Sequence, residues 1–190
     1  MKKLNQIAII PARMQPPHLG HFNLLANMVG KFKKTLVLIY DFPLSEQNPF
    51  TSKQRQKWLS EGLRELNDMY NLKFTQENLE LIFLTAEFNT ATDEEIQGYI
   101  HEITEKTPFT IISLNPKTLK KCSELGFETL KPTELEAKFP LHPSLLTHLN
   151  DHGTQIRSFL EKNEPIPTGY LPKSIKPATL KKIYQKNQPK

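Results

Sequence analysis

Short apolar runs alternate with longer stretches of mixed polarity along the first two thirds of the chain. The runs have the length of buried strands, and the stretches between them repeat apolar residues at helical spacing. This pattern predicts strands at residues 4–10, 35–40, 79–84, 109–114 and 127–130. It predicts helices at residues 18–30, 51–66, 92–104 and 116–126. Because strands alternate with helices, we expect parallel pairing through right-handed crossovers.

Two of the predicted helices begin with a capping pattern. Thr51 is followed three residues later by Gln54, and Thr92 is followed at the same spacing by Glu95. In such a pair each side chain accepts a hydrogen bond from the backbone of the other, so these residues fix where the helices start.

The carboxyl-terminal third has a different pattern. Residues 131–153 lack strong periodicity and contain several prolines, and two helices are predicted after them, at 154–163 and 177–186. The sequence therefore predicts an α/β fold, a Rossmann-like, doubly wound parallel sheet of about five strands with a carboxyl-terminal helical appendage. We expect one domain over residues 1–190, with its core in 1–135 and the helical portion in 136–190.

Composition narrows the class of protein. Hydrophobic residues make up 37% of the 190 residues in the chain. No apolar run approaches the ~20 residues that are needed to span a bilayer. The single cysteine, Cys122, excludes an internal disulfide, so a cytoplasmic protein is expected. The net charge is +5, and residues 172–190 are rich in lysine and contain no acid. That tail is either a solvated basic segment or an attractor of polyanions.

The segment "RMQPPHLGH" (13–21) directly follows the first predicted strand. His18 and His21 lie three positions apart and so share one face of the first helical turn, while Gly20 lets a ligand approach the backbone between them. The two prolines suit a turn and the first helical position. Arg13 adds a positive charge, and free backbone amides add hydrogen-bond donors, at the helix amino terminus. Ligands of parallel sheets bind there, so the segment predicts a polyphosphate site.

Two other interpretations of the histidine pair remain open. Histidines near a helix start can be surface caps, and histidines three apart can chelate a metal. No acid or cysteine nearby completes a ligand set, so we expect no protein-held metal.

A second candidate segment, "HGTQIR", lies far along the chain at residues 152–157. Gly153 and Thr154 open a predicted helix, and Arg157 follows one turn later on the same face. A hydroxyl, a guanidinium and a helix amino terminus suit phosphate oxygens, although an ordinary capped helix would have the same pattern.

These motifs together resemble the nucleotidylyltransferase superfamily, and most closely its archaeal-type nicotinamide-mononucleotide adenylyltransferases. "RMQPPHLGH" is similar to the family's G-R-[FM]-Q-P-F-H-x-G-H, and "GTQIR" to the core of its last motif. Between them, "NPFTSKQR" (48–55) and the stretch from 113 to 132 also match in order. The similarity covers roughly residues 6 to 185.

The resemblance implies roles for the matched residues. His21 would contact the α-phosphate of a nucleoside triphosphate, and His18 the adjoining phosphates. Arg13 and Arg157 would hold the β- and γ-phosphates with Thr154. The residues matched to nucleotide binding are Gly20, Gly153, Thr154 and Asn115. Mg²⁺ would be carried with the triphosphate.

The acceptor region departs from the family pattern. The family has a tryptophan after its third strand that stacks on nicotinamide, whereas residues 87–100 contain none. Phe88, Asn89 and Tyr99 are the candidates to replace its contacts. "YDFPLSE" (40–46) also stands in place of a Gly-Ser-rich segment.

The resemblance implies an enzyme that transfers an adenylyl group from ATP to nicotinamide mononucleotide and so forms NAD and pyrophosphate. Two alternatives remain: the same chemistry on another phosphorylated metabolite or with CTP, and a non-catalytic module that binds nucleotides or nucleic acid. The motifs for transfer are retained and no known nucleic-acid motif is present, so nucleic acid is not the expected partner. Relatives of this type often assemble, which leaves a homo-oligomer open.

Overall fold

The computed structural model describes residues 7–29, 31–71, 74–85, 91–134 and 153–187. They form two compact units. The first, here called the sheet unit, is drawn from the described parts of residues 1–12, 27–40 and 75–141. The second, here called the helical unit, is drawn from the described parts of residues 13–26, 41–74 and 142–190.

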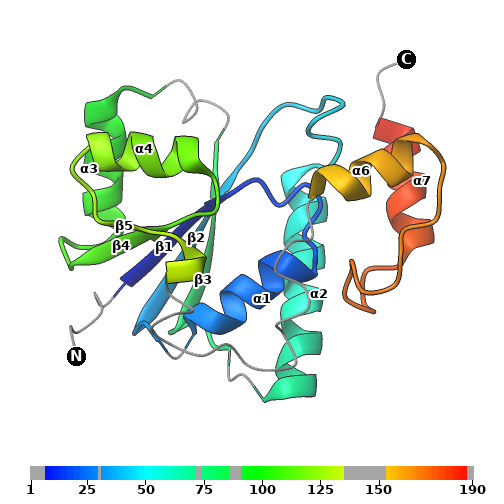
Figure 1. Ribbon diagram of the computed structural model, residues 1–190, viewed down its shortest axis with the longest axis horizontal. Coiled ribbons are helices and arrows are strands. Elements are labelled where there is room, and N and C mark those ends of the chain that lie inside the picture. Colours follow the sequence, from blue (N-terminus) through cyan, green and yellow to red (C-terminus); the bar gives the residue numbers. More distant parts are fainter. Residues whose placement is uncertain (1–6, 30, 72–73, 86–90, 135–152, 188–190) are drawn as a thin grey trace. The chain divides into compact units, whose positions relative to one another are not determined.

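The sheet unit contains five parallel strands in the order β3-β2-β1-β4-β5 (Figure 1). The strands are β1 (Ile7–Ala12), β2 (Lys34–Tyr40), β3 (Leu79–Leu84), β4 (Phe109–Ile112) and β5 (Thr129–Leu130). β1 is central, as expected for the first strand of a Rossmann-like sheet. The predicted parallel α/β fold with interleaved helices is confirmed.

β1 ends later than the sequence predicts. It continues through Pro11, which pairs with Leu38 of β2. Pairing with β4 has already stopped at Ile9. The amide of Ile7 donates toward the β4 side, to Pro108 at 3.4 Å, and residues of the same parity face the same way. The nitrogen of Pro11 therefore faces β4, where β1 is no longer paired. Its lack of an N–H group costs the sheet no hydrogen bond.

One face of the sheet is covered by α3 (Asp93–Ile103) and α4 (Pro116–Glu124) (Figure 1). Both helices start at the residues that the sequence predicts. The Thr92–Glu95 capping box is present, and the Asn115 side chain caps α4 by accepting from the Lys117 amide at 3.0 Å. The buried cluster beneath the helices consists of Ile7, Ile9, Leu36, Leu38, Leu84, Ile100, Ile111 and Phe127.

Two ionisable side chains pack against the edge of this cluster. Burial raises the pKa of the Tyr40 phenol, and the nearby Cys122 adds to the shift. Burial also raises the pKa of the Cys122 thiol, against the opposing charge of Lys121. Both groups are therefore held in their neutral forms.

The helical unit contains α1 (Leu19–Met28) as far as Ala26, α2 (Ser52–Tyr70), α6 (Gly153–Glu161) and α7 (Pro177–Asn187). α2 begins at the predicted Thr51–Gln54 capping box but runs beyond Leu66, ending at Asn71 with a φ of 51°. Trp58 is 4% exposed and lies edge-on to Phe50 at 5.1 Å, so it is a core residue.

Hydrogen bonds tie the carboxyl-terminal segment into the helical unit. The Glu65 carboxylate accepts from the backbone amides of Lys173 at 2.9 Å and Ser174 at 2.6 Å. The Asn187 side chain donates to the Pro49 carbonyl at 2.8 Å, beside the start of α2. The predicted division of a single domain near residue 135 stays a prediction.

Candidate phosphate-binding site

The loop of residues 13–18, which follows β1, is held by two arginines from distant parts of the chain. Arg55 of α2 donates from Nη1 to the carbonyl of Arg13 at 2.8 Å. Arg157 of α6 donates from Nη1 to the carbonyl of Gln15, across a sequence separation of 142 residues. The two motifs that the sequence analysis singled out therefore meet at this loop.

The Gln15 side chain fixes the loop from the other side. Its amide nitrogen donates to the Phe50 carbonyl at 2.9 Å, and its amide oxygen accepts from the Phe50 nitrogen at 3.1 Å. Gln15 is 2% exposed, so both bonds are shielded from water. Beside it, the buried Met14 adopts a left-handed φ of 53°, which a non-glycine residue holds only where its surroundings dictate it.

The two histidines lie against each other at the start of α1. Their ring centroids are 3.8 Å apart with planes tilted by 40°. His18 is buried, while His21 is partly exposed. The backbone N–H of His18 donates to Nδ1 of His21 at 3.4 Å. Because Nδ1 accepts this bond, the neutral His21 ring carries its proton on Nε2 and can donate it to a ligand.

The expectation of free amides at this helix start is wrong for three residues. The Leu19 amide donates to the Tyr170 carbonyl and the His21 amide to the His18 carbonyl, both at 2.9 Å, and the His18 amide donates to Nδ1 of His21. The two prolines also lie in the loop rather than at the first helical position, because α1 begins at Leu19. Hydrogen-bond donors to an anion at this site must therefore come from side chains rather than from these amides.

α6 approaches the loop closely because its first residue is a glycine. A Cβ on Gly153 would lie 3.1 Å from the Gln15 carbonyl oxygen and 3.4 Å from Nη1 of Arg157. Within α6, Nη2 of Arg157 donates to the Thr154 hydroxyl at 3.0 Å. Two of the five N–H donors of this guanidinium are thus used in fixing it, and the other three have no hydrogen-bond partner among the described residues.

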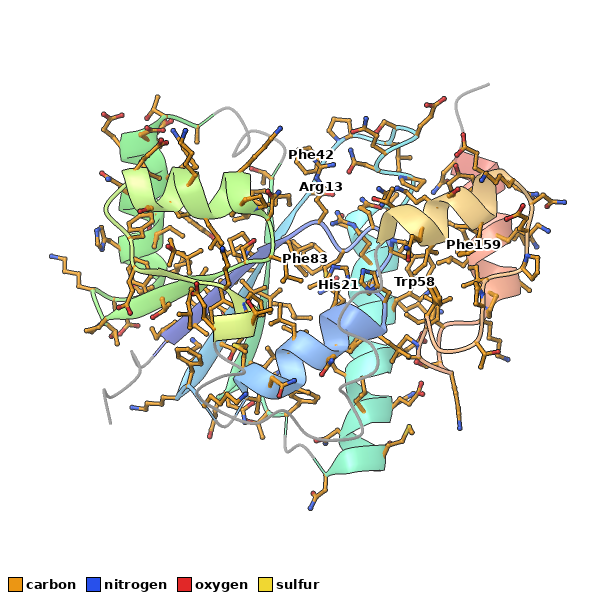
Figure 2. All side chains as sticks on the ribbon, viewed as in Figure 1. Arg13, His21, Phe42, Trp58, Phe83 and Phe159 are labelled. Atoms are coloured by element: carbon orange, nitrogen blue, oxygen red, sulfur yellow. The ribbon has the colours of Figure 1, made fainter. Side chains whose placement is uncertain are left out.

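The site carries a concentrated positive charge. Burial lowers the pKa of Arg157, and the neighbouring positive charge of Arg13 lowers it further, against a smaller opposing effect of Tyr184. The Arg13 guanidinium lies over the Phe42 ring, 5.1 Å from its centroid (Figure 2). Within the described part of the chain, neither Arg13 nor Arg157 has an acidic partner. An anion bound here would relieve their mutual repulsion.

The helical unit contains most of the predicted site residues. These are Arg13, His18, Gly20, His21, Gly153, Thr154 and Arg157. Asn115 and Tyr99 belong to the sheet unit, where Asn115 is an exposed helix cap and Tyr99 packs against the buried cluster. Burial raises the pKa of Tyr99, and the charges of Glu102 and Glu80 add to the shift. Phe88 and Asn89 lie outside the described residues.

Sequence reasoning did not find the residues that hold the loop in place. Gln15 and Arg55 stand within matched motifs, but nothing in their spacing shows that they bond across 35 and 42 positions. Asp41 and Phe42 lie in the segment that departs from the family pattern, and that departure is the signal that could have drawn attention to them.

The described residues do not form a metal site by themselves. No group of three or more histidine, cysteine, aspartate or glutamate residues among them could hold an ion. In addition, none of the helices in the described ranges is long and apolar enough to cross a membrane.

Comparison with known proteins extends the resemblance. No family model matches the sequence. The chain is 23% identical over 170 residues to nicotinamide-nucleotide adenylyltransferase of Sulfurisphaera tokodaii, covering 88% of this chain and 87% of that protein.

Two solved structures share the fold. One is a bifunctional NMN adenylyltransferase/ADP ribose pyrophosphatase from Francisella tularensis complexed with AMP and a manganese ion, with a TM-score of 0.67 and 16% identity. The match covers 96% of this chain but 52% of that one, so this chain spans about half the length of the bifunctional protein. The other is Plasmodium falciparum nicotinic acid mononucleotide adenylyltransferase complexed with APC, with a TM-score of 0.55, 14% identity and coverages of 95% and 98%.

The similar proteins are adenylyltransferase enzymes, and the similarity extends over nearly the whole of this chain. The chain therefore has the nucleotidylyltransferase fold, as its motifs predict, and is a distant homologue of an archaeal nicotinamide-nucleotide adenylyltransferase.

Proposed function

We propose that the protein transfers the adenylyl group of ATP to the phosphate of nicotinamide mononucleotide, releasing pyrophosphate and forming NAD. An acceptor phosphate oxygen attacks the α-phosphorus in line. The bond from that phosphorus to the bridging oxygen of the β-phosphate breaks, and pyrophosphate leaves with the electron pair. No covalent enzyme intermediate is needed, so catalysis consists of alignment and stabilisation of charge.

One observation carries this proposal. The Arg157 guanidinium is bonded to the loop that bears His18 and His21, and the neighbouring positive charge of Arg13 lowers its pKa. Neither arginine has an acidic partner among the described residues. Such a pair of like charges destabilises the folded protein, a bound anion offsets that cost, and a triphosphate supplies several negative charges.

Each side chain has a defined task in this reaction. His21 donates from Nε2 to the α-phosphate as negative charge develops there, and His18 supports the adjoining phosphate. Arg13, Arg157 and the Thr154 hydroxyl hold the β- and γ-phosphates and then the departing pyrophosphate. Mg²⁺ enters with ATP, as part of the substrate.

The choice of nicotinamide mononucleotide as acceptor is supported by the Sulfurisphaera relative. The nicotinic acid form is the natural competitor, because the Plasmodium structure belongs to an enzyme of that class. Both acceptors present the same phosphate monoester and differ only at the carboxamide of the ring.

Pyrophosphate release tests the proposal. The protein is incubated with ATP or CTP and a panel of acceptors: nicotinamide mononucleotide, nicotinic acid mononucleotide and other phosphorylated metabolites. We expect release with ATP and nicotinamide mononucleotide, and an NAD product. Turnover restricted to another acceptor, or to CTP, would change the assigned substrate but would still support nucleotidyl transfer as the reaction. Binding of nucleotides or RNA without pyrophosphate release would refute the proposal that the protein is an enzyme.

The His21→Ala variant tests the site within the same assay. Removal of one donor to a developing oxyanion costs ~3–4 kcal/mol, so turnover should fall about 100- to 1,000-fold while the unfolding temperature stays near that of the wild type. His101→Ala is the matched control, since His101 is exposed at the end of α3 in the sheet unit. It should retain full activity. Near-normal turnover of His21→Ala would refute the assignment.

A further inference from the structure

Arg55 is a buried cation that bonds to the loop of residues 13–18 but is not itself a predicted ligand-binding residue. It lies in the first turn of α2, and its side chain is fully buried, with 0% exposure. Burial lowers its pKa, and the neighbouring Asp41 opposes that shift. A charged group removed from water in this way must be closely paired, because its desolvation is costly.

Two partners of Arg55 lie on separate loops. Nη1 donates to the Arg13 carbonyl at 2.8 Å, and Nη2 donates to Oδ1 of Asp41 at 2.8 Å. Arg13 follows β1 and Asp41 follows β2. One rigid planar group therefore fixes the backbone of the first loop and the side chain of the second at the same time.

This connection acts next to the residue that would bind phosphate. The carbonyl that Arg55 holds belongs to Arg13 itself, whose side chain extends over Phe42, the residue after Asp41. Met14, which follows Arg13 in the chain, has the left-handed φ of 53° that turns the loop. The Arg55 contacts thus fix both the origin of the Arg13 side chain and the ring on which it rests.

We propose that Arg55 is a positioning residue for triphosphate binding: its fork joins the Arg13 carbonyl to the Asp41 carboxylate and so directs the Arg13 guanidinium. This role rests on the proposed function. In this role Arg55 makes no contact with the substrate. The planar geometry of its guanidinium should therefore matter more for ATP binding than its positive charge does.

Conservative variants separate geometry from charge. Arg55→Lys keeps the positive charge but replaces the planar fork with a single ammonium, which cannot hold both acceptors in the same geometry. Asp41→Asn removes the negative charge but keeps an oxygen that can accept from Arg55. Arg64→Lys is the matched control, because Arg64 is exposed on the same helix.

Steady-state kinetics and hydrogen exchange give the readouts. For Arg55→Lys we expect kcat/KM for ATP to fall about 100-fold, as for a misplacement of about 1 Å, with little change in KM for the acceptor. Amide exchange should accelerate in peptides covering residues 11–22 and stay unchanged in the remainder of α2. Asp41→Asn should lower the unfolding temperature, because it removes the charge partner of a buried cation, but it should lower kcat/KM for ATP much less than Arg55→Lys does. Arg64→Lys should stay close to wild type.

Three outcomes would overturn the proposal. Arg55→Lys with wild-type kcat/KM and exchange would show that the fork is not needed. Acceleration of exchange throughout the helical unit would show a general role in folding. An Asp41→Asn defect as large as that of Arg55→Lys would show that neutralisation of charge, not geometry, is what matters. If the wild type itself releases no pyrophosphate, the proposed function fails. The exchange of residues 11–22 then decides separately whether Arg55 fixes the loop.

Discussion

Gly153 permits the closest contact between α6 and the loop of residues 13–18, so its replacement by alanine is a direct test of that contact. The added Cβ would lie 3.1 Å from the Gln15 carbonyl oxygen and 3.4 Å from Nη1 of Arg157. The first neighbour is backbone that is itself bonded to Arg157 and cannot rotate away. α6 must therefore move outward by a few tenths of an ångström.

The energetic effect is the difference of two opposing contributions. Overpacking at a rigid contact costs roughly 1–3 kcal/mol, while alanine in place of glycine favours a helix by up to about 1 kcal/mol. We expect Gly153→Ala to lower the free energy of unfolding by about 1 kcal/mol, which is ~2–4 °C in Tm for a chain of this size. Because Arg157 moves with α6, kcat/KM for ATP should fall about tenfold.

A second glycine in a helix supplies the control. Gly98 lies within α3, and a Cβ there would meet nothing within 4 Å. Gly98→Ala should therefore raise the free energy of unfolding by about 0.5–1 kcal/mol and leave activity unchanged. Thermal unfolding and pyrophosphate release are measured on both variants. A Gly153→Ala protein as stable and as active as Gly98→Ala would refute the argument that α6 must approach the loop this closely.

Two further substitutions test packing and ionisation. In Gly62→Ala the new Cβ would lie 2.4 Å from Cζ of the fully buried Phe22, so the urea midpoint should fall by the equivalent of about 3 kcal/mol with an unchanged m-value. A wild-type midpoint would show that the ring moves aside freely. Tyr40→Phe tests alkaline stability. The folded protein raises the pKa of both Tyr40 and Cys122, so it holds these protons more tightly than the unfolded chain. Stability is therefore complete below the unfolded pKa values and declines above about pH 9, and Tyr40→Phe should make that decline shallower in pH-dependent unfolding. An identical slope would contradict the burial argument.

The sequence predicts the sheet and the helix starts well because those features are encoded locally. Thr51 and Thr92 begin helices through side-chain bonds to residues three positions away, and no distant contact can change that pattern. Pro11 shows the limit of local reasoning: a proline usually ends a strand, yet β1 continues through it because β4 no longer pairs there.

The candidate site divides in the same way. The contacts of His18 with His21 and of Thr154 with Arg157 could be predicted, because each pair is only three positions apart in the sequence. The contacts that bring the pairs to one loop could not, because they depend on tertiary structure and, in Gln15, on a side chain that bonds to the backbone of Phe50. Polar residues in a loop are expected at the surface, whereas Gln15 is buried.

The chain crosses between its sheet unit and its helical unit five times, after residues 12, 26, 40, 74 and 141. Neither unit is thus encoded by one continuous stretch of gene. No single crossover between related genes can therefore exchange one complete unit without also replacing part of the other. The residues of the candidate site and the strands of the sheet must then be inherited together.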